Sequence, residues 1–172
     1  YAADLAERRW AKPLAYARFM AEDLARRVAE SRALFPWKFF RGDCHLHSTW
    51  SDGGASIEDM ARTAISLGHE YMVLTDHSPR LTVAHGLNRE RLEAQLDDIE
   101  ILRERVAPFR ILTGMEVDIL EDGLLDLDDD LLERLDVVVA SVHSKLKMDG
   151  PEMTARMMRA VAAESGMTMG QI

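Results

Sequence analysis

The 172-residue sequence is short of cysteine and of long apolar runs. Its single cysteine, Cys44, excludes an intrachain disulfide, so we expect a protein of a reducing compartment. No apolar run approaches the roughly 18 residues of a membrane span, and the first residues carry no signal-peptide pattern. The sequence therefore predicts a cytoplasmic protein that does not associate with membranes.

An excess of positive charge is also missing. The formal net charge is −9, which argues against a broad nucleic-acid-binding surface because nucleic acids are polyanions. A local nucleic-acid site remains compatible with this charge, since bound metal ions reverse the sign of a site built from acidic residues.

The spacing of apolar residues divides the chain into two parts. Residues 1–36 carry an amphipathic stripe that includes Tyr16, Met20 and Leu24, and they are predicted to form a helical leader. Residues 37–172 alternate between strand-like and helix-like segments, which predicts an α/β domain with a parallel sheet. The expected strands are residues 38–47, 71–77, 110–119 and 136–143. The expected helices are residues 56–68 with Ser56 as N-cap, 88–106 with Asn88 as N-cap, 127–135 and 151–164.

Each predicted strand ends in side chains that can bind a metal ion. In chain order these are His45 and His47, Asp76 and His77, Glu116 and Asp118, and His143. The carboxyl ends of parallel barrel strands form one rim, so these residues are expected to converge although roughly 30 residues or more separate successive strands. Asp52, in the loop after the first strand, can reach the same rim. A lone His-x-His is weak evidence, but recurrence at the same phase of four units predicts a polynuclear metal centre.

Strand alternation makes a further prediction about the first strand. Asp43, His45 and His47 are expected to share one face, while Cys44 points the other way and packs as a small apolar residue.

Four other ionisable residues lie outside this predicted ligand set. His69 follows a helix end and is expected to be structural, whereas the role of His85 stays open. Arg80 and Lys145 follow ligand positions and are candidates for binding an anionic substrate. The alternative for both is that they are solvated loop charges.

Four motifs taken together resemble the PHP domain, a family named for polymerase and histidinol phosphatase. They are "GDCHLHSTWSDG", "YMVLTDHS", "GMEVDI" and "VVVASVHS". The stretch "TDHSPRLTVAHGL" is similar in particular to the version carried at the C-terminus of bacterial family X DNA polymerases and by their stand-alone relatives. The resemblance covers Phe39 to Val161.

The resemblance implies a distorted seven-stranded, TIM-like β/α barrel that holds two or three ions of zinc, manganese or iron. Carried over position by position, the implied metal ligands are His45, His47, Asp52, His77, Glu116 and His143. Glu116 would bridge two ions and, with Asp52, would be catalytic. Asp43 and Asp76 would orient the imidazoles from behind the ligands.

The chain contains about four βα units, and no histidine follows His143. The family pattern implies further ligands from later strands, namely one histidine and an Asp-x-His pair. We therefore expect a partial PHP barrel in residues 37–172, interrupted on its C-terminal side. An open sheet edge in such a barrel would favour self-association.

The function implied by the resemblance is that of a metal-dependent phosphoesterase. It would hydrolyse a phosphomonoester or a nucleic-acid 3′ end by means of metal-activated water. The expected partner is accordingly a small phosphorylated substrate or a DNA 3′ end. Two alternatives remain open: an amidohydrolase-type metallohydrolase, which also sets histidines at barrel strand ends, and a catalytically incompetent remnant that binds metal or a partner.

Overall fold

The computed structural model describes residues 26–27 and 40–165. Apart from Arg26 and Arg27, the predicted helical leader of residues 1–36 lies outside the described residues, so its boundary stays a prediction. One compact unit begins at Arg41, and the fold described below belongs to that unit. No helix in the described part of the chain is both long and apolar enough to cross a membrane.

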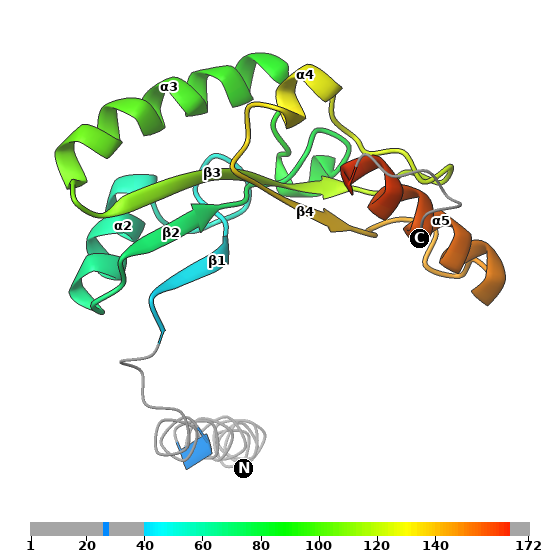
Figure 1. Cartoon of the computed structure of the whole chain (residues 1–172), viewed down its shortest axis with the longest axis horizontal. Helices are drawn as coiled ribbons and strands as arrows, with labels where there is room; N and C mark the ends of the chain where they lie inside the picture. Colours follow the sequence, from blue (N-terminus) through cyan, green and yellow to red (C-terminus); the bar gives the residue numbers. More distant parts are fainter. Residues whose placement is uncertain (1–25, 28–39, 166–172) are drawn as a thin grey trace, which may run out of the picture. The chain divides into compact units, whose positions relative to one another are not determined.

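A four-stranded sheet forms the centre of this unit (Figure 1). Its strands are β1 (Gly42–Leu46), β2 (Tyr71–Leu74), β3 (Arg110–Asp118) and β4 (Val137–Ser141). All three pairings are parallel, and the spatial order follows the chain order. The predicted α/β class and parallel sheet are thus confirmed, and the curled sheet with its alternating helices is a partial β/α barrel.

All four strands are shorter than predicted, β3 by a single residue. β1 ends at Leu46, β2 at Leu74 and β4 at Ser141, so His47, His77 and His143 lie just beyond the strand ends. The sequence could not reveal this difference, because apolar and metal-binding residues follow one another without a turn signal. His45 lies inside β1, and Glu116 and Asp118 lie inside β3.

The two helices with predicted N-caps begin where the sequence predicts, directly after Ser56 and Asn88. In α2 (Ile57–Ser66) the Ser56 side chain accepts a hydrogen bond from the Asp59 amide, and in α3 (Arg89–Val106) Asn88 accepts one from the Arg91 amide. Each cap satisfies an amide that has no partner within its helix. The other two helices are α4 (Asp129–Leu132), which is shorter than predicted, and α5 (Gly150–Ser165).

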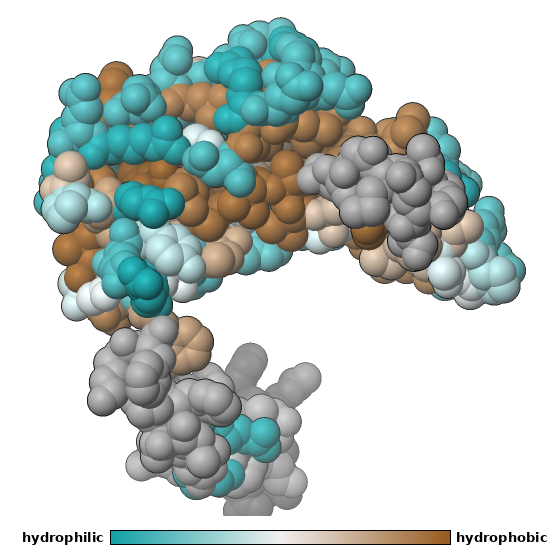
Figure 2. All heavy atoms as spheres, viewed as in Figure 1, coloured by the Kyte–Doolittle hydropathy of each residue, from teal (hydrophilic) through white to brown (hydrophobic). Residues whose placement is uncertain are grey.

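Two apolar clusters hold the helices against the sheet. The first joins α2 and α3 to Met72, Leu74 and Ile111 of the sheet, and the second surrounds Met115 and Val117 of β3. Figure 2 shows the outer surface of α3 as mainly hydrophilic, with apolar residues over the sheet beneath it. The burial of one helix face explains the helical spacing of apolar residues in the sequence.

The two edge strands are less buried than the central ones. β2 is almost wholly buried, whereas β4 is partly buried and β1 is largely exposed. The prediction that Cys44 packs as an apolar residue is wrong, because this edge strand leaves Cys44 exposed, with its Sγ 3.9 Å from the Tyr71 hydroxyl. Self-association through a sheet edge stays a prediction.

Asp136 joins β3 to the start of β4 at the end of the sheet opposite to the predicted ligands. Its Oδ2 accepts hydrogen bonds from the amide and the hydroxyl of Thr113, each at 2.9 Å, and from Nη2 of Arg103 at 2.9 Å. Burial by itself would raise the pKa of Asp136, but these hydrogen bonds and the charge of Arg103 outweigh burial and lower the pKa below its ordinary value.

We expect the substitution Asp136→Asn to reduce the free energy of unfolding near pH 7. A carboxyl group whose pKa is lowered by folding stabilises the protein above its unfolded pKa of about 4, and this contribution disappears as the pH falls through the folded pKa. In urea denaturation, the free energy of unfolding of wild type should therefore exceed that of Asp136→Asn near pH 7, and the difference should become smaller toward about pH 3. Asp97→Asn, at an exposed position of α3, is the control and should match wild type at both pH values. If the difference in free energy of unfolding between wild type and Asp136→Asn does not change with pH, this account is contradicted.

Candidate metal centre

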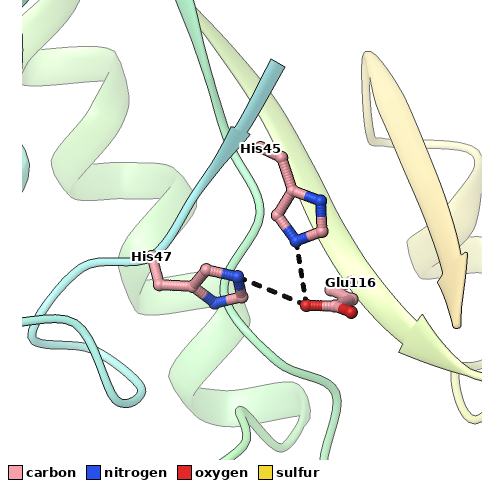
Figure 3. A group of neighbouring side chains, drawn as sticks. All are labelled: His45, His47 and Glu116. Atoms are coloured by element: carbon pink, nitrogen blue, oxygen red, sulfur yellow. Dashed lines mark hydrogen bonds and ion pairs between the residues drawn. The ribbon is translucent and has the colours of Figure 1, made fainter. Parts of the chain in front are cut away.

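Four imidazoles from three loops and one strand converge on the carboxylate of Glu116. Its Oε2 lies 3.0 Å from Nε2 of His45, 3.2 Å from Nε2 of His47 and 3.5 Å from Nδ1 of His77. Its Oε1 lies 3.2 Å from Nε2 of His143. Figure 3 shows His45 and His47 pointing at this carboxylate. The structure thus brings together residues that are up to 98 positions apart in the sequence (143 − 45 = 98).

An extra residue in β1 decides which side chains of that strand face Glu116. Asp43 pairs with Met72 and Leu46 with Leu74, so three steps along β1 match two steps along β2. Such a bulge changes the face on which later side chains lie. It places Asp43 on the same side as Leu46, away from the imidazoles, and Asp43 is exposed with its Oδ1 3.4 Å from the backbone nitrogen of His45. The predicted alignment of Asp43 with the two histidines is therefore wrong.

Asp52 lies beside the second and third imidazoles. Its Oδ1 is 3.5 Å from Nδ1 of His47, and its Oδ2 is 3.6 Å from Nε2 of His77. The rings of His47 and His77 are 4.4 Å apart, centre to centre. Asp52 comes from the loop after β1, as its sequence position suggested.

Asp118 has a contact that the sequence did not reveal. Its Oδ1 forms a hydrogen bond with Nδ1 of His143, while its own amide donates to Oγ of Ser78 at 3.0 Å. Asp118 is 3% exposed. A carboxylate that holds one nitrogen of an imidazole leaves the other nitrogen directed at the site, and here that nitrogen is the one near Glu116. In the sequence, the placement of Asp118 near the site was indicated by its spacing of two residues from Glu116, which puts both on one face of a strand, but the contact with His143 was not indicated.

Asp76 lies behind the site rather than in it. Its oxygens accept hydrogen bonds from Ser48, Ser51 and Gln95, and it does not contact an imidazole directly among the described residues. Gln95, on α3, had no role in the sequence interpretation, because nothing in the pattern of a helix identifies a polar residue that is buried against a distant loop.

The predicted substrate-binding residues lie on the surface. The backbone amide of Arg80 donates to Asp126, and Nζ of Lys145 lies 3.4 Å from Oε2 of Glu121. Both side chains are exposed, and so is His85, whose carbonyl accepts a hydrogen bond from Arg91. A substrate-binding role for Arg80 and Lys145 stays a prediction.

The donor atoms fit divalent metal ions. They form three groups whose atoms lie within 4.8 Å of one another: His45, His47 and Glu116; His47, Asp52 and His77; His77, Glu116 and His143. In the described part of the chain, Nδ1 of His47 and Nδ1 of His77 are buried without a hydrogen-bond partner. Buried polar atoms are costly to leave unpaired, and a metal ion would satisfy them. Imidazole with carboxylate suits zinc, manganese and iron.

The ionisation of the two most buried members also favours metal binding. Burial lowers the pKa of His77, which favours the neutral imidazole that coordinates metals. Burial opposes ionisation of Glu116, but the pKa of this carboxyl group is nevertheless lowered, with hydrogen bonds from Ser141 and His45 favouring the carboxylate. Glu116 is therefore held as a carboxylate.

Comparisons of the sequence with family models and with known proteins agree with one another. A model of the PHP domain matches residues 43–169. The chain is 54% identical over 104 residues to the "DNA polymerase/3'-5' exonuclease PolX" of Bacillus subtilis, an alignment that covers 60% of this chain and 18% of that protein. It is 36% identical over 104 residues to a protein named "Probable phosphatase" of Thermoanaerobacter sp. strain X514, covering 59% of this chain and 40% of the relative. A protein of Acetivibrio thermocellus with the same description is 33% identical over 103 residues. The chain thus spans well under half the length of these relatives.

The sharing of ligands among the three groups predicts unequal effects of two neighbouring substitutions. His47 belongs to two groups and His45 to one, so His47→Ala should remove more metal than His45→Ala. We expect metal analysis after dialysis against low concentrations of Mn²⁺ or Zn²⁺ to rank the ion content as wild type, then His45→Ala, then His47→Ala. His85→Ala, at an exposed position outside the three groups, is the control and should retain the wild-type content. Equal metal content in all four proteins would contradict the assignment of His45 and His47 as metal ligands.

Proposed function

Because the chain belongs to the PHP domain family, we propose that it is part of a metal-dependent phosphoesterase that acts through the site around Glu116. The observation that carries this proposal is the convergence of four imidazoles on one buried carboxylate at the carboxyl ends of a parallel sheet. That end of a β/α barrel is where active sites are built. The mixture of imidazole and shared carboxylate is suited to holding neighbouring divalent ions.

Each residue has a distinct task in this proposal. Divalent ions, when bound, would lower the pKa of a water molecule and stabilise negative charge on the oxygens of a phosphate ester. Glu116 belongs to two of the ligand groups and would hold them at a short distance from each other. Asp52 would complete the group of His47 and His77. Asp118 would keep the proton of His143 on Nδ1, so that Nε2 remains free to coordinate.

The substrate we favour is a nucleic-acid 3′ end, with a small phosphomonoester as the alternative. The name of the relative with 54% identity includes a 3′-5′ exonuclease, whereas the relatives with lower identity are named phosphatases. Both substrates are phosphate esters and require the same metal chemistry. Arg80 and Lys145 are our candidates for holding the anionic part of either substrate.

An assay with three substrates tests this function. The purified protein, supplied with Mn²⁺ or Zn²⁺, is incubated with a single-stranded oligonucleotide, the same oligonucleotide with a 3′-phosphate, and an aryl phosphate. We expect hydrolysis of at least one substrate that a chelator abolishes and added metal restores. Shortening of the oligonucleotide would support a nucleic-acid end as substrate, whereas turnover of the aryl phosphate alone would support the phosphomonoester. Metal binding without any turnover would instead support the alternative that the chain is a catalytically incompetent remnant that binds metal.

Glu116 and Asp118 should differ in their importance for turnover. Glu116→Gln removes the charge shared by two ligand groups, so we expect activity to fall to background. Asp118→Asn leaves every proposed ligand in place and loses only the contact that orients His143, which typically costs roughly 10-fold to 100-fold. The measurement is kcat/KM with the best substrate of the assay above. A larger loss for Asp118→Asn than for Glu116→Gln would show that the roles are reversed.

A further inference from the structure

The carboxylate of Asp76 is fully buried, with four hydrogen-bond donors and no cationic side chain bound to it among the described residues. Oδ1 accepts from the Ser48 amide at 2.8 Å and from the Ser51 hydroxyl. Oδ2 accepts from the Ser48 hydroxyl at 2.6 Å and from Nε2 of Gln95 at 2.7 Å. A buried carboxylate is costly unless its lone pairs are satisfied, and this one meets only donors.

Three of the four residues of this network are sequence neighbours of the members of one ligand group. Ser48 follows His47, Ser51 precedes Asp52, and Asp76 itself precedes His77. His47, Asp52 and His77 form the second of the three ligand groups. One carboxylate therefore joins the two chain segments that supply this group, and Gln95 fixes it to α3.

The loop between His47 and Asp52 is also closed on itself. The Ser48 carbonyl accepts hydrogen bonds from the Ser51 amide at 3.1 Å and the Gly53 amide at 2.9 Å. A Cβ atom at Gly53 would lie 2.1 Å from the carbonyl oxygen of His47, so this position requires glycine. Hydrogen bonds within the loop therefore define its conformation, and the hydrogen bonds to Asp76 fix its position relative to His77 and α3.

We infer that Asp76 is a positioning residue whose charge holds His47, Asp52 and His77 as one metal-binding group without itself touching the ion. The inference rests on the metal-dependent function proposed above. It differs from the sequence prediction that Asp76 orients the imidazoles directly, because its contacts are with the serines of the loop and with α3.

Asparagine at position 76 has nearly the shape of aspartate but lacks its charge. One side-chain oxygen would be replaced by an NH2 group, which would face donors instead of accepting from them. We therefore expect Asp76→Asn to weaken metal binding at this group by roughly 10-fold to 100-fold, the usual range for residues that support metal ligands. In titration calorimetry with Mn²⁺ or Zn²⁺, the protein should lose about one tightly bound ion per chain.

Asp136→Asn is the matched control for a general loss of stability. Asp136 also accepts several hydrogen bonds, but at the opposite end of the sheet. Both variants are titrated at a temperature at which circular dichroism shows them fully folded. Asp136→Asn should lower stability and keep the wild-type metal stoichiometry. Unchanged metal binding in Asp76→Asn, or an equal loss in Asp136→Asn, would overturn the inference.

Ser51→Ala provides a second, milder variant if Asp76→Asn does not fold. It removes one donor and keeps the Asp76 charge, so metal affinity should fall by several-fold with little change in stability. Ser66→Ala, on the exposed surface of α2, is its control and should bind metal like wild type. Wild-type affinity in Ser51→Ala would count against the inference. If the wild-type protein itself binds no metal, the proposed function fails as well, whereas a failure confined to the variants refutes only the role of Asp76.

Discussion

The burial of one carboxylate among four imidazoles is the constraint on which the rest of the site depends. Glu116 is 6% exposed, and its backbone is tied on both sides. Its amide donates to the Asp76 carbonyl at 3.1 Å, its carbonyl accepts from the Ser78 amide at 3.0 Å, and it pairs with Val139 of β4. A residue held in the central strand of a sheet has little freedom to move. The histidines, which come from shorter strands and from loops, are therefore arranged around Glu116 rather than the reverse.

Buried charges that do not touch the imidazoles hold the surrounding loops. Asp76 binds the loop after β1, as described above. On the other side, Arg156 of α5 is fully buried and donates to the carbonyls of Leu120 at 2.7 Å and Ser144 at 2.9 Å, and also to that of Ile119. These carbonyls follow β3 and β4, close to Asp118 and His143. A charged group bound to several neutral partners replaces its lost water contacts and gives a loop one defined position.

The ends of the sheet differ in their chemistry. A cavity of about 910 Å³ lies at the amino ends of the strands, where Arg41, Tyr71 and Arg110 are among its lining residues. Its charges are largely paired with one another, as in the ion pair of Arg41 with Glu70. Among the described residues, the amino-end cavity has one buried imidazole nitrogen without a hydrogen-bond partner, Nδ1 of His69, whereas the carboxyl ends have two, Nδ1 of His47 and Nδ1 of His77, beside carboxylates that could bind the same ion. Parallel strands direct all their carboxyl ends to one edge, so a site assembled from several loops forms there and not at the cavity beside the amino ends.

The sequence by itself determined the parallel α/β class, the helix caps and the identity of the residues that converge on Glu116, because each of these follows from local spacing repeated along the chain. It could not determine the register of β1, since the bulge that turns Asp43 away from the imidazoles depends on pairing with β2. Nor could it identify the partners of the buried carboxylates. Asp76 binds Gln95 of α3, and Asp118 binds His143, across 19 and 25 positions of sequence. Only the tertiary structure decided these contacts, because a hydrogen bond between side chains depends on which elements pack together and leaves no periodic signal in the sequence.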